Sequence, residues 1–142
     1  MSVENNILNR FIKKLIFKGK KFKSYKLISA SLRFIQKNSK KNHRQLLQLS
    51  LINLAPLFNI KIIRKKRKKS KEFPFFLVNK LRLSLSIKFI LNNIKSKKKI
   101  ANKMLAKEIL LIMKNNNSLI LKKNLLVDRS FSQKKYANYR WF

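Results

Sequence analysis

The sequence predicts a mainly helical fold that carries one two-stranded β-ribbon. Apolar residues recur every three or four positions through most of the 142 residues, which is the spacing of helices that bury one face. One stretch near the middle instead places β-branched and aromatic residues on either side of a run of cations, as two strands joined by a charged turn do. The length fits one hydrophobic core, so we expect residues 1–142 to form a single domain.

Two helices are expected in the first 37 residues. The first has an apolar stripe, and Asn5 or Asn6 stands where an N-cap would begin it. Gly19 then occupies the place of a left-handed residue that ends a helix. The second helix covers about residues 22–37. The face that it should turn to the core is formed by Tyr25, Ile28, Leu32 and Ile35.

A third helix is expected at about residues 43–54, after a basic turn at residues 38–42. His43 stands at its start, where we expect it to begin or cap the helix rather than to act in chemistry. Pro56 should end the helix, because proline disfavours helical geometry in the residue before it.

The β-ribbon, here called the arm, is predicted at about residues 57–78. Its strands are residues 57–63 and 72–78, and residues 64–71 form a tip that is nearly all cations. Pro74 lies in the second strand and indicates an edge position or a bulge, since proline cannot donate a hydrogen bond to a neighbouring strand. The alternative is a disordered charged run between two helices.

Local pattern leaves the segment after the arm open. At residues 81–94, the alternation of apolar and polar residues favours a strand, whereas an apolar face at helical spacing favours a helix equally well. From Ile100 the period is helical, and one face is formed by Ala101, Met104, Leu105, Glu108 and Ile112. A final helix is expected at about residues 124–138, leading into an aromatic and basic end at residues 136–142.

The charge balance of the chain requires a polyanionic partner. There are 37 Lys and Arg residues against four acids, which gives a formal charge of +33. Like-charge repulsion on this scale opposes a compact state unless anions outside the protein relieve it. A disordered basic tail would be poor in apolar residues, whereas 45% of this chain is hydrophobic. We therefore expect a folded body that binds nucleic acid, with an anionic membrane surface as the second choice.

The same composition argues against enzyme and metal chemistry. The chain has no Cys, one His and one Gly, so thiolate sites, disulfides and glycine-rich phosphate loops are not expected. Its four acids are scattered, and Glu108 is expected to satisfy a neighbouring cation. We expect no catalysis, no metal, no cofactor and no small-molecule substrate. The longest uncharged stretch, residues 45–60, is too short to span a membrane, and no secretory signal is recognisable.

Cations gather in clusters that we expect to form a phosphate-binding surface. The clusters are residues 18–23, 64–71, 95–99, 122–123 and 134–135. The candidates on the body are Lys18, Lys20, Lys21, Lys23, Lys80, Arg82, Lys88, Lys95, Lys97, Lys98, Lys99, Lys122 and Lys123. Those on the arm are Arg64, Lys65, Lys66, Arg67, Lys68, Lys69 and Lys71. Near the end of the chain, Tyr139, Arg140 and Trp141 form a candidate contact. Trp141 with Tyr139 either packs on the body, which we favour, or offers a surface on which a base stacks.

Four motifs follow one another along the chain. They are Gly19-Lys20-Lys21, Phe73-Pro74-Phe75, Leu105-Ala106-Lys107-Glu108-Ile109 and Tyr136-Ala137-Asn138-Tyr139-Arg140-Trp141. In order and spacing they resemble the Gly-Lys-Lys turn, the Val-Pro-Val arm strand, the Leu-Ala-Asn-Glu-Leu helix and the closing Phe-Ala-His-Tyr-Arg-Trp of the small-subunit ribosomal protein S7 family. The last motif is the most specific, and the resemblance covers about residues 5–141.

The resemblance implies a bundle of six helices with a β-hairpin arm between the third and fourth helices, which would make residues 81–94 a helix. It also implies a structural protein that binds the 3′ domain of small-subunit rRNA, organises the head of the subunit and places its arm near the exit-site tRNA. The implied partners are rRNA, neighbouring small-subunit ribosomal proteins, exit-site tRNA and mRNA, with no membrane. The sequence departs from the family pattern at two places. Lys and Arg replace the glycine pair of the family's arm, and Val78-Asn79 replaces an Arg-Pro that precedes the fourth helix.

Residue usage bears on where the protein works. Lys, Asn, Ile and Phe, which have AT-rich codons, are abundant, while Gly and Pro are scarce. This bias predicts an organelle-encoded protein of the mitochondrial ribosome, with a plastid as the lesser alternative. The rival functions are non-specific compaction of DNA in a nucleoid and the binding of basic amphipathic helices to an anionic membrane surface. Charge alone does not separate them from rRNA binding.

Overall fold

The computed structural model describes residues 3–16, 18–39, 42–65, 68–96 and 102–138. Its helices are α1 (Val3–Leu15), α2 (Lys21–Lys37), α3 (His43–Leu54), α4 (Asn79–Ser96), α5 (Asn102–Met113) and α6 (Ser118–Ser132), followed by a short 3₁₀ helix, η1 (Lys134–Tyr136). The antiparallel strands β1 (Phe58–Lys65) and β2 (Lys68–Phe76) lie between α3 and α4. The predicted order of six helices with an arm between the third and fourth is confirmed, and residues 81–94 are helical.

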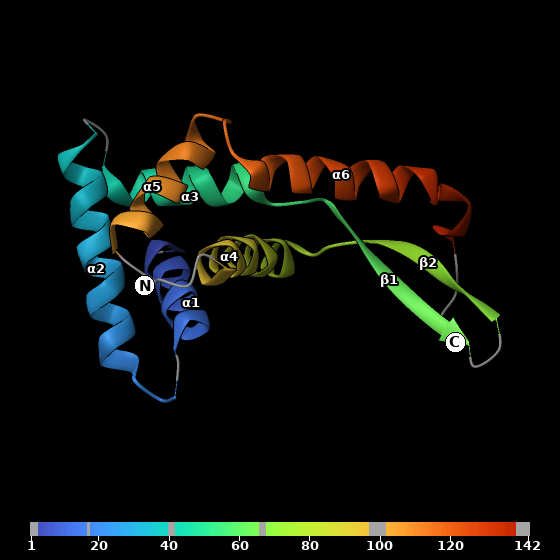
Figure 1. Ribbon diagram of the computed structural model, residues 1–142, viewed down its shortest axis with the longest axis horizontal. Helices are drawn as coiled ribbons and strands as arrows, with labels where there is room; N and C mark the ends of the chain where they lie inside the picture. Colours follow the sequence, from blue (N-terminus) through green and yellow to red (C-terminus); the bar gives the residue numbers. More distant parts are fainter. Residues whose placement is uncertain (1–2, 17, 40–41, 66–67, 97–101, 139–142) are drawn as a thin grey trace.

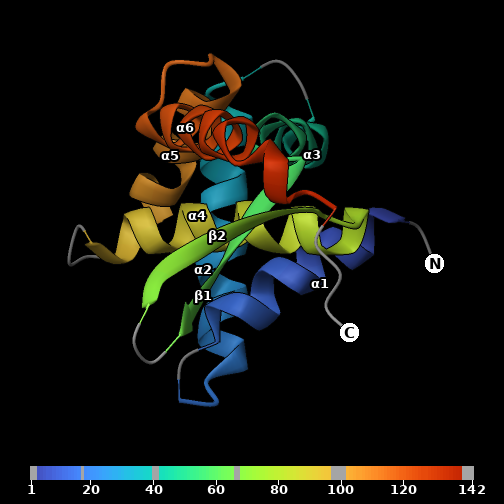
Figure 2. The ribbon, with the colours of Figure 1, turned by 90° about the vertical axis from the view of Figure 1, so that its right-hand side faces the viewer.

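The molecule is elongated, with α2 at one end of its long axis and the arm at the other (Figure 1). Helix α6 runs along this axis from the bundle towards the arm. In the turned view α3, α5 and α6 lie on one side, α1 lies on the opposite side, and α4 passes between them (Figure 2). The arm is therefore an extension of one end of the bundle.

The hydrophobic core is built around α5, which packs against α2, α3 and α4. Three α5 side chains, Leu105, Ile109 and Ile112, are fully buried. The other large side chains that are fully buried come from the surrounding helices and are Phe11, Ile28, Ile35, Leu51, Leu54, Ile87, Ile90, Ile94 and Leu119. Burial of such a side chain is worth about 1.5–3 kcal/mol, so these residues hold the bundle together. In the described part of the chain, no helix has the length and apolar content needed to cross a bilayer.

One predicted helix end is confirmed by the backbone, and the other only in part. Gly19 has φ +73°, the left-handed conformation that glycine adopts without strain, but α1 already ends at Leu15, so Gly19 lies in the connection to α2 and does not end α1. A side chain added there would meet no atom within 4 Å, so only the backbone conformation favours glycine at this position. Helix α3 ends at Leu54, and Ala55 is extended with ψ 111°, as expected for the residue before Pro56.

The start of α3 is also as predicted. His43 is the first helical residue, and the side chain of Asn42 caps the helix by accepting a hydrogen bond from the Arg44 N–H at 3.2 Å. His43 therefore begins the helix, while Asn42 does the capping.

The predicted starts of the first and last helices are wrong. Helix α1 begins at Val3 and continues through Asn5 and Asn6, because an asparagine inside a helix costs at most about 0.7 kcal/mol relative to alanine, too little to end it. Helix α6 covers Ser118–Ser132 rather than residues 124–138, because Asn117 caps it through a bond from the Leu119 N–H at 3.1 Å.

The predicted core face of α2 is wrong at Tyr25, which is 53% exposed. Ser24 takes the buried position instead, one turn before Ile28. Its hydroxyl lies within hydrogen-bond distance of the Leu15 carbonyl, 3.3 Å away at the end of α1. A small side chain lets α1 and α2 approach closely here, and a tyrosine would not fit between them.

The strands of the arm are longer than predicted towards the tip. Pairing continues through Ile63 with Lys71 to Lys65 with Lys68, inside the run that was expected to be a cationic turn. Lysines do not prevent this backbone pairing, because both strands of a two-stranded ribbon are edge strands, where charged residues are common. Pro74 lies opposite Ile60 in an edge strand, one of the two positions that its presence indicated, and the register shift lies between Ile63 and Lys65.

Candidate nucleic-acid interface

Four candidate cations surround the turn between α1 and α2. Lys18, Lys20, Lys21 and Lys23 are all exposed, and α2 begins at Lys21. We call residues 18–23 the α1–α2 turn. The positive end of a helix dipole disfavours cations and favours anions, so lysines here are unfavourable in the isolated chain. A phosphate bound at this turn would relieve both the repulsion among the lysines and their conflict with the dipole.

Two other candidates have internal roles in the fold. Arg82, which is half-buried, donates from Nε to the Pro56 carbonyl at 3.2 Å and so ties the start of α4 to the start of the arm. Lys123, also half-buried, donates from Nζ to the Asn53 carbonyl at 2.7 Å, at the negative end of α3. By contrast, Lys80, Lys88 and Lys122 are exposed.

Several candidates lie outside the described residues. They are Lys66, Arg67, Lys97, Lys98, Lys99, Tyr139, Arg140 and Trp141. The backbone is described, but not the side chains, at Arg64, Lys65, Lys68, Lys69 and Lys95. On the arm, Lys71 is exposed, and its ammonium lies 5.8 Å from the centre of the Tyr136 ring in η1.

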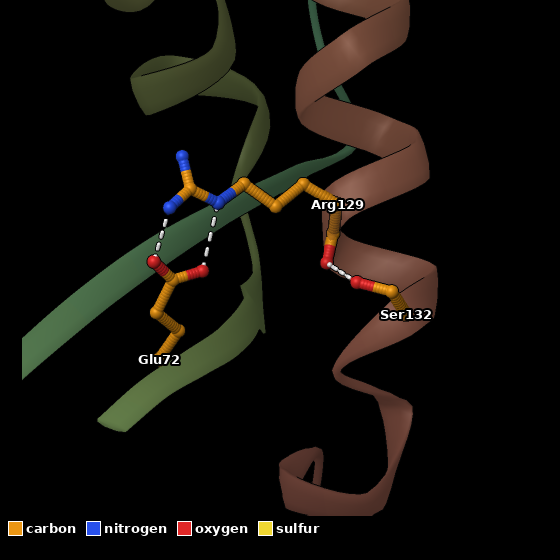
Figure 3. A network of polar contacts seen from close by, with 3 residues as sticks. All are labelled: Glu72, Arg129 and Ser132. Atoms are coloured by element: carbon orange, nitrogen blue, oxygen red, sulfur yellow. Dashed lines mark hydrogen bonds and ion pairs between the residues drawn. The ribbon is translucent and has the colours of Figure 1, made fainter. Parts of the chain in front are cut away.

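An ion pair fixes the base of the arm to α6. The Arg129 guanidinium donates to both carboxylate oxygens of Glu72 on β2, and the Nε bond is 2.8 Å long (Figure 3). Bidentate pairing of this kind adds directional specificity to the attraction. The Glu72 side chain is 18% exposed, whereas that of Arg129 is 62% exposed. Water therefore reaches the pair, and its contribution to the free energy of folding is on the order of 0–1 kcal/mol.

Aromatic contacts from both strands of the arm add to this attachment. The ring of Phe58 on β1 lies 4.7 Å from that of Phe76 and 5.6 Å from that of Phe131 in α6. The ring of Phe73 on β2 lies 5.4 Å from that of Tyr136. Pairs at such distances are worth about 0.5–1.5 kcal/mol beyond their burial. The base of the arm is therefore packed on α6 and η1.

Two of the four acids of the chain make contacts within the fold. Glu72 holds the arm, and Glu108, which is 4% exposed, accepts a hydrogen bond of 2.8 Å from the Asn117 amide. Because Asn117 also caps α6, the two acids fix α6 at its two ends. Asp128 is exposed. In the described part of the chain, no three His or acidic side chains gather as metal ligands, and no acid lies in the first turn of α2 to α6.

Reversing the charge at Arg129 should loosen the base of the arm while the body stays folded. In Arg129→Glu, two carboxylates would face each other, and β2 amides should exchange hydrogen faster while α5 amides keep their protection. Adding Glu72→Arg restores an opposite pair and should restore protection. Lys122→Glu makes the same charge change at an exposed site of α6 and serves as the control. Unchanged exchange in β2 would show that the ion pair does not hold the arm.

Comparisons with known proteins find a family model and several relatives that match most of the chain. The model of the family described as Ribosomal protein S7p/S5e matches residues 2–130. The chain is 28% identical to the small ribosomal subunit protein uS7 of Wigglesworthia glossinidia brevipalpis over 138 residues, which cover 96% of this chain and 88% of that protein. It is 29% identical to the uS7m protein of Reclinomonas americana, with 96% and 86% covered. For the uS7m protein of Schizosaccharomyces pombe the identity is 30% over 110 residues, with 76% and 42% covered.

Proposed function

The chain belongs to the ribosomal protein S7p/S5e family, and from this membership we propose that it binds the 3′ domain of small-subunit rRNA and organises the head of the subunit. Membership makes the protein a non-enzymatic structural constituent of the small ribosomal subunit. Its partners in general are therefore small-subunit rRNA and other ribosomal proteins. The finer assignment, to one rRNA domain and to the head, is the proposal.

The observation that carries the proposal is the separation of acids from cations. Glu72 and Glu108 are engaged within the fold, while the lysines of the α1–α2 turn are exposed. Lys80 and Lys88 of α4 and Lys122 of α6 add further exposed cations on the body. A surface with this excess of exposed lysine suits phosphate groups, which give affinity without reading base sequence.

The arm is proposed to lie along nucleic acid, either rRNA or the exit-site tRNA. Its base is fixed on α6, and it extends from the end of the bundle that lies opposite α2 (Figure 1). Residues 64–71 contain seven cations and Ser70, so this part of the arm would be repelled by the basic body. Nucleic acid beyond the body would supply the missing counter-charge.

We further propose that the ribosome concerned is mitochondrial. Relatives of the chain come from both a bacterium and eukaryotes, so ribosome association is common to all of them. The bias towards Lys, Asn, Ile and Phe supports an AT-rich organellar gene. Hybridisation of a probe for this gene to purified mitochondrial DNA tests the assignment, and a signal confined to nuclear or plastid DNA would exclude an organelle-encoded mitochondrial protein.

Binding to an rRNA fragment that contains the 3′ domain should weaken steeply as salt rises. Each phosphate that the protein neutralises releases counterions, so a protein that neutralises 6–10 phosphates binds roughly 10³–10⁵ more weakly at about 200 mM salt than at about 50 mM. The measurement is a filter-binding titration at several salt concentrations, with a duplex DNA of equal phosphate content beside it. At about 150 mM salt we expect tighter binding to the rRNA. Equal affinity for both would favour the nucleoid function instead.

A further inference from the structure

Beside its buried core positions, α2 lines an open groove of about 480 Å³, and one lining residue, Phe34, is half-buried and also packs against the core. Its lining includes two short side chains, Ser29 and Ala30, and longer side chains precede and follow them along α2. All of its lining residues come from α2, so this α2 groove lies at the end of the molecule opposite the arm (Figure 1). From Phe22 to Lys37 it extends about 22 Å along the helix axis, at about 1.5 Å per residue.

Three aromatic side chains line the α2 groove. Phe22 and Tyr25 stand at its N-terminal end, and Phe34 stands nearer its C-terminal end. Phe22 is 78% exposed and Tyr25 is 53% exposed, so neither ring contributes much to the core. Single exposed apolar residues are common, but two exposed rings one turn apart on one helix face offer flat surfaces to a planar partner.

Three cations stand among these rings. Lys26, Arg33 and Lys37 line the same groove, and all are exposed. None of the three has an acidic partner among the residues that the structure describes. The N-terminal end of the groove continues into the α1–α2 turn, where further lysines lie exposed. Cations alternating with aromatic rings in a groove are the combination that binds single-stranded nucleic acid.

We propose that the α2 groove binds an unpaired segment of RNA, with bases stacked on Phe22 and Tyr25 and phosphates held by Lys26, Arg33 and Lys37. The inference rests on the proposed rRNA-binding function and adds to it the kind of RNA that this end of the molecule takes. A duplex hides the faces of its bases, so it can use the cations of the groove but not the rings. An unpaired segment can use both, because its bases can turn out and stack on aromatic side chains.

The test replaces both rings with leucine in the full chain. Phe22→Leu/Tyr25→Leu keeps apolar side chains and every charge, so it removes stacking while leaving the salt slope unchanged. At about 150 mM salt we expect an unpaired ten-nucleotide RNA of mixed sequence to bind roughly 5- to 150-fold more weakly for each base that no longer stacks. Binding of a short RNA duplex should stay within about twofold. A 2-aminopurine base in the oligonucleotide should be quenched by the parent protein and not by the variant.

Two further variants define the site. Leu121→Ala/Leu125→Ala removes apolar surface from exposed positions of α6, which are 65% and 66% exposed, and should leave binding of the oligonucleotide unchanged. Lys26→Gln/Arg33→Gln/Lys37→Gln should reduce the salt slope for the oligonucleotide.

Unchanged oligonucleotide binding by the leucine variant, or an equal loss for oligonucleotide and duplex, would overturn the proposal. In the first case a protein segment that needs only apolar contact would be the better occupant. Binding of the rRNA 3′ domain, measured in parallel, reports on the proposed function separately.

Discussion

A Leu105→Asp variant is expected to be unfolded in near-physiological buffer. Leu105 is the fourth residue of α5, is fully buried, and belongs to the helix on which the bundle is built. A carboxylate there would lose its hydration with no cation provided to pair with it, and burial of an unpaired charge costs many kcal/mol. The whole free energy of unfolding of a domain is only about 5–15 kcal/mol. The helical circular dichroism signal should therefore be lost at temperatures where the parent protein is folded.

A matched variant separates burial from charge. Leu121→Asp makes the same chemical change at a position of α6 that is 65% exposed, and it should keep the helical signal. Ile109→Asp, at another fully buried position of α5, should behave like Leu105→Asp. A Leu105→Asp protein with a cooperative thermal transition near that of the parent would mean that α5 does not form the centre of the core.

Removing five cations from the arm should abolish much of the RNA affinity while the helical bundle stays intact. The variant replaces Lys65, Lys66, Arg67, Lys68 and Lys69 with Ser. The core consists of other residues, and the described attachment of the arm base involves Phe58, Phe73 and Glu72 rather than these five. The log–log salt slope of RNA binding should fall by roughly 0.7–0.9 for each phosphate that the variant no longer neutralises.

The control removes the same charge elsewhere. Five exposed lysines in α1, in α5 and directly after α5 can be changed to Gln, which keeps helix propensity, and they are Lys13, Lys14, Lys103, Lys107 and Lys114. This control should lower the salt slope less than the arm variant does. If the arm variant lost its helices and kept its salt slope, core and arm would have been assigned the wrong way round. If control and arm variants were equal, general charge would account for the binding.

The order of elements was predictable, since periodicity, Gly19 and Pro56 marked the joints that the structure has. Residues 81–94 were not predictable from local pattern, because Leu83 and Ile87 fit a strand and a helix equally, and only packing against the rest of the bundle decides between them. The resemblance to a known family resolved this segment correctly. Helix α6 was placed too late, because the capping side chain of Asn117 stands among neighbouring asparagines that gave no distinct signal.

The candidate site was predictable as a charge pattern and not as a set of contacts. The exposure of the α1–α2 turn follows from its lysine-rich composition. The hydrogen bond from Lys123 to the Asn53 carbonyl, by contrast, joins residues 70 positions apart, and no local sequence pattern in either segment predicts it. The Glu72–Arg129 pair joins residues 57 positions apart in the same way. The α2 groove was missed because Tyr25 fits the helical period of the core face, and its displacement by Ser24 depends on how closely α1 approaches.

The attachment of the arm also sets an order of events during synthesis. The strands emerge from the translating ribosome before α6 and η1, whose residues 118–136 supply the ring and guanidinium contacts at the arm base. A two-stranded hairpin on its own is marginally stable in water, so the nascent arm has no fixed direction at that stage. The ring and guanidinium contacts that direct it form only when Arg129, Phe131 and Tyr136 have been made. A chain that stalls before α6 thus lacks these partners of its arm base, while Arg82, which bonds to the Pro56 carbonyl, and the helices that surround α5 are already synthesised.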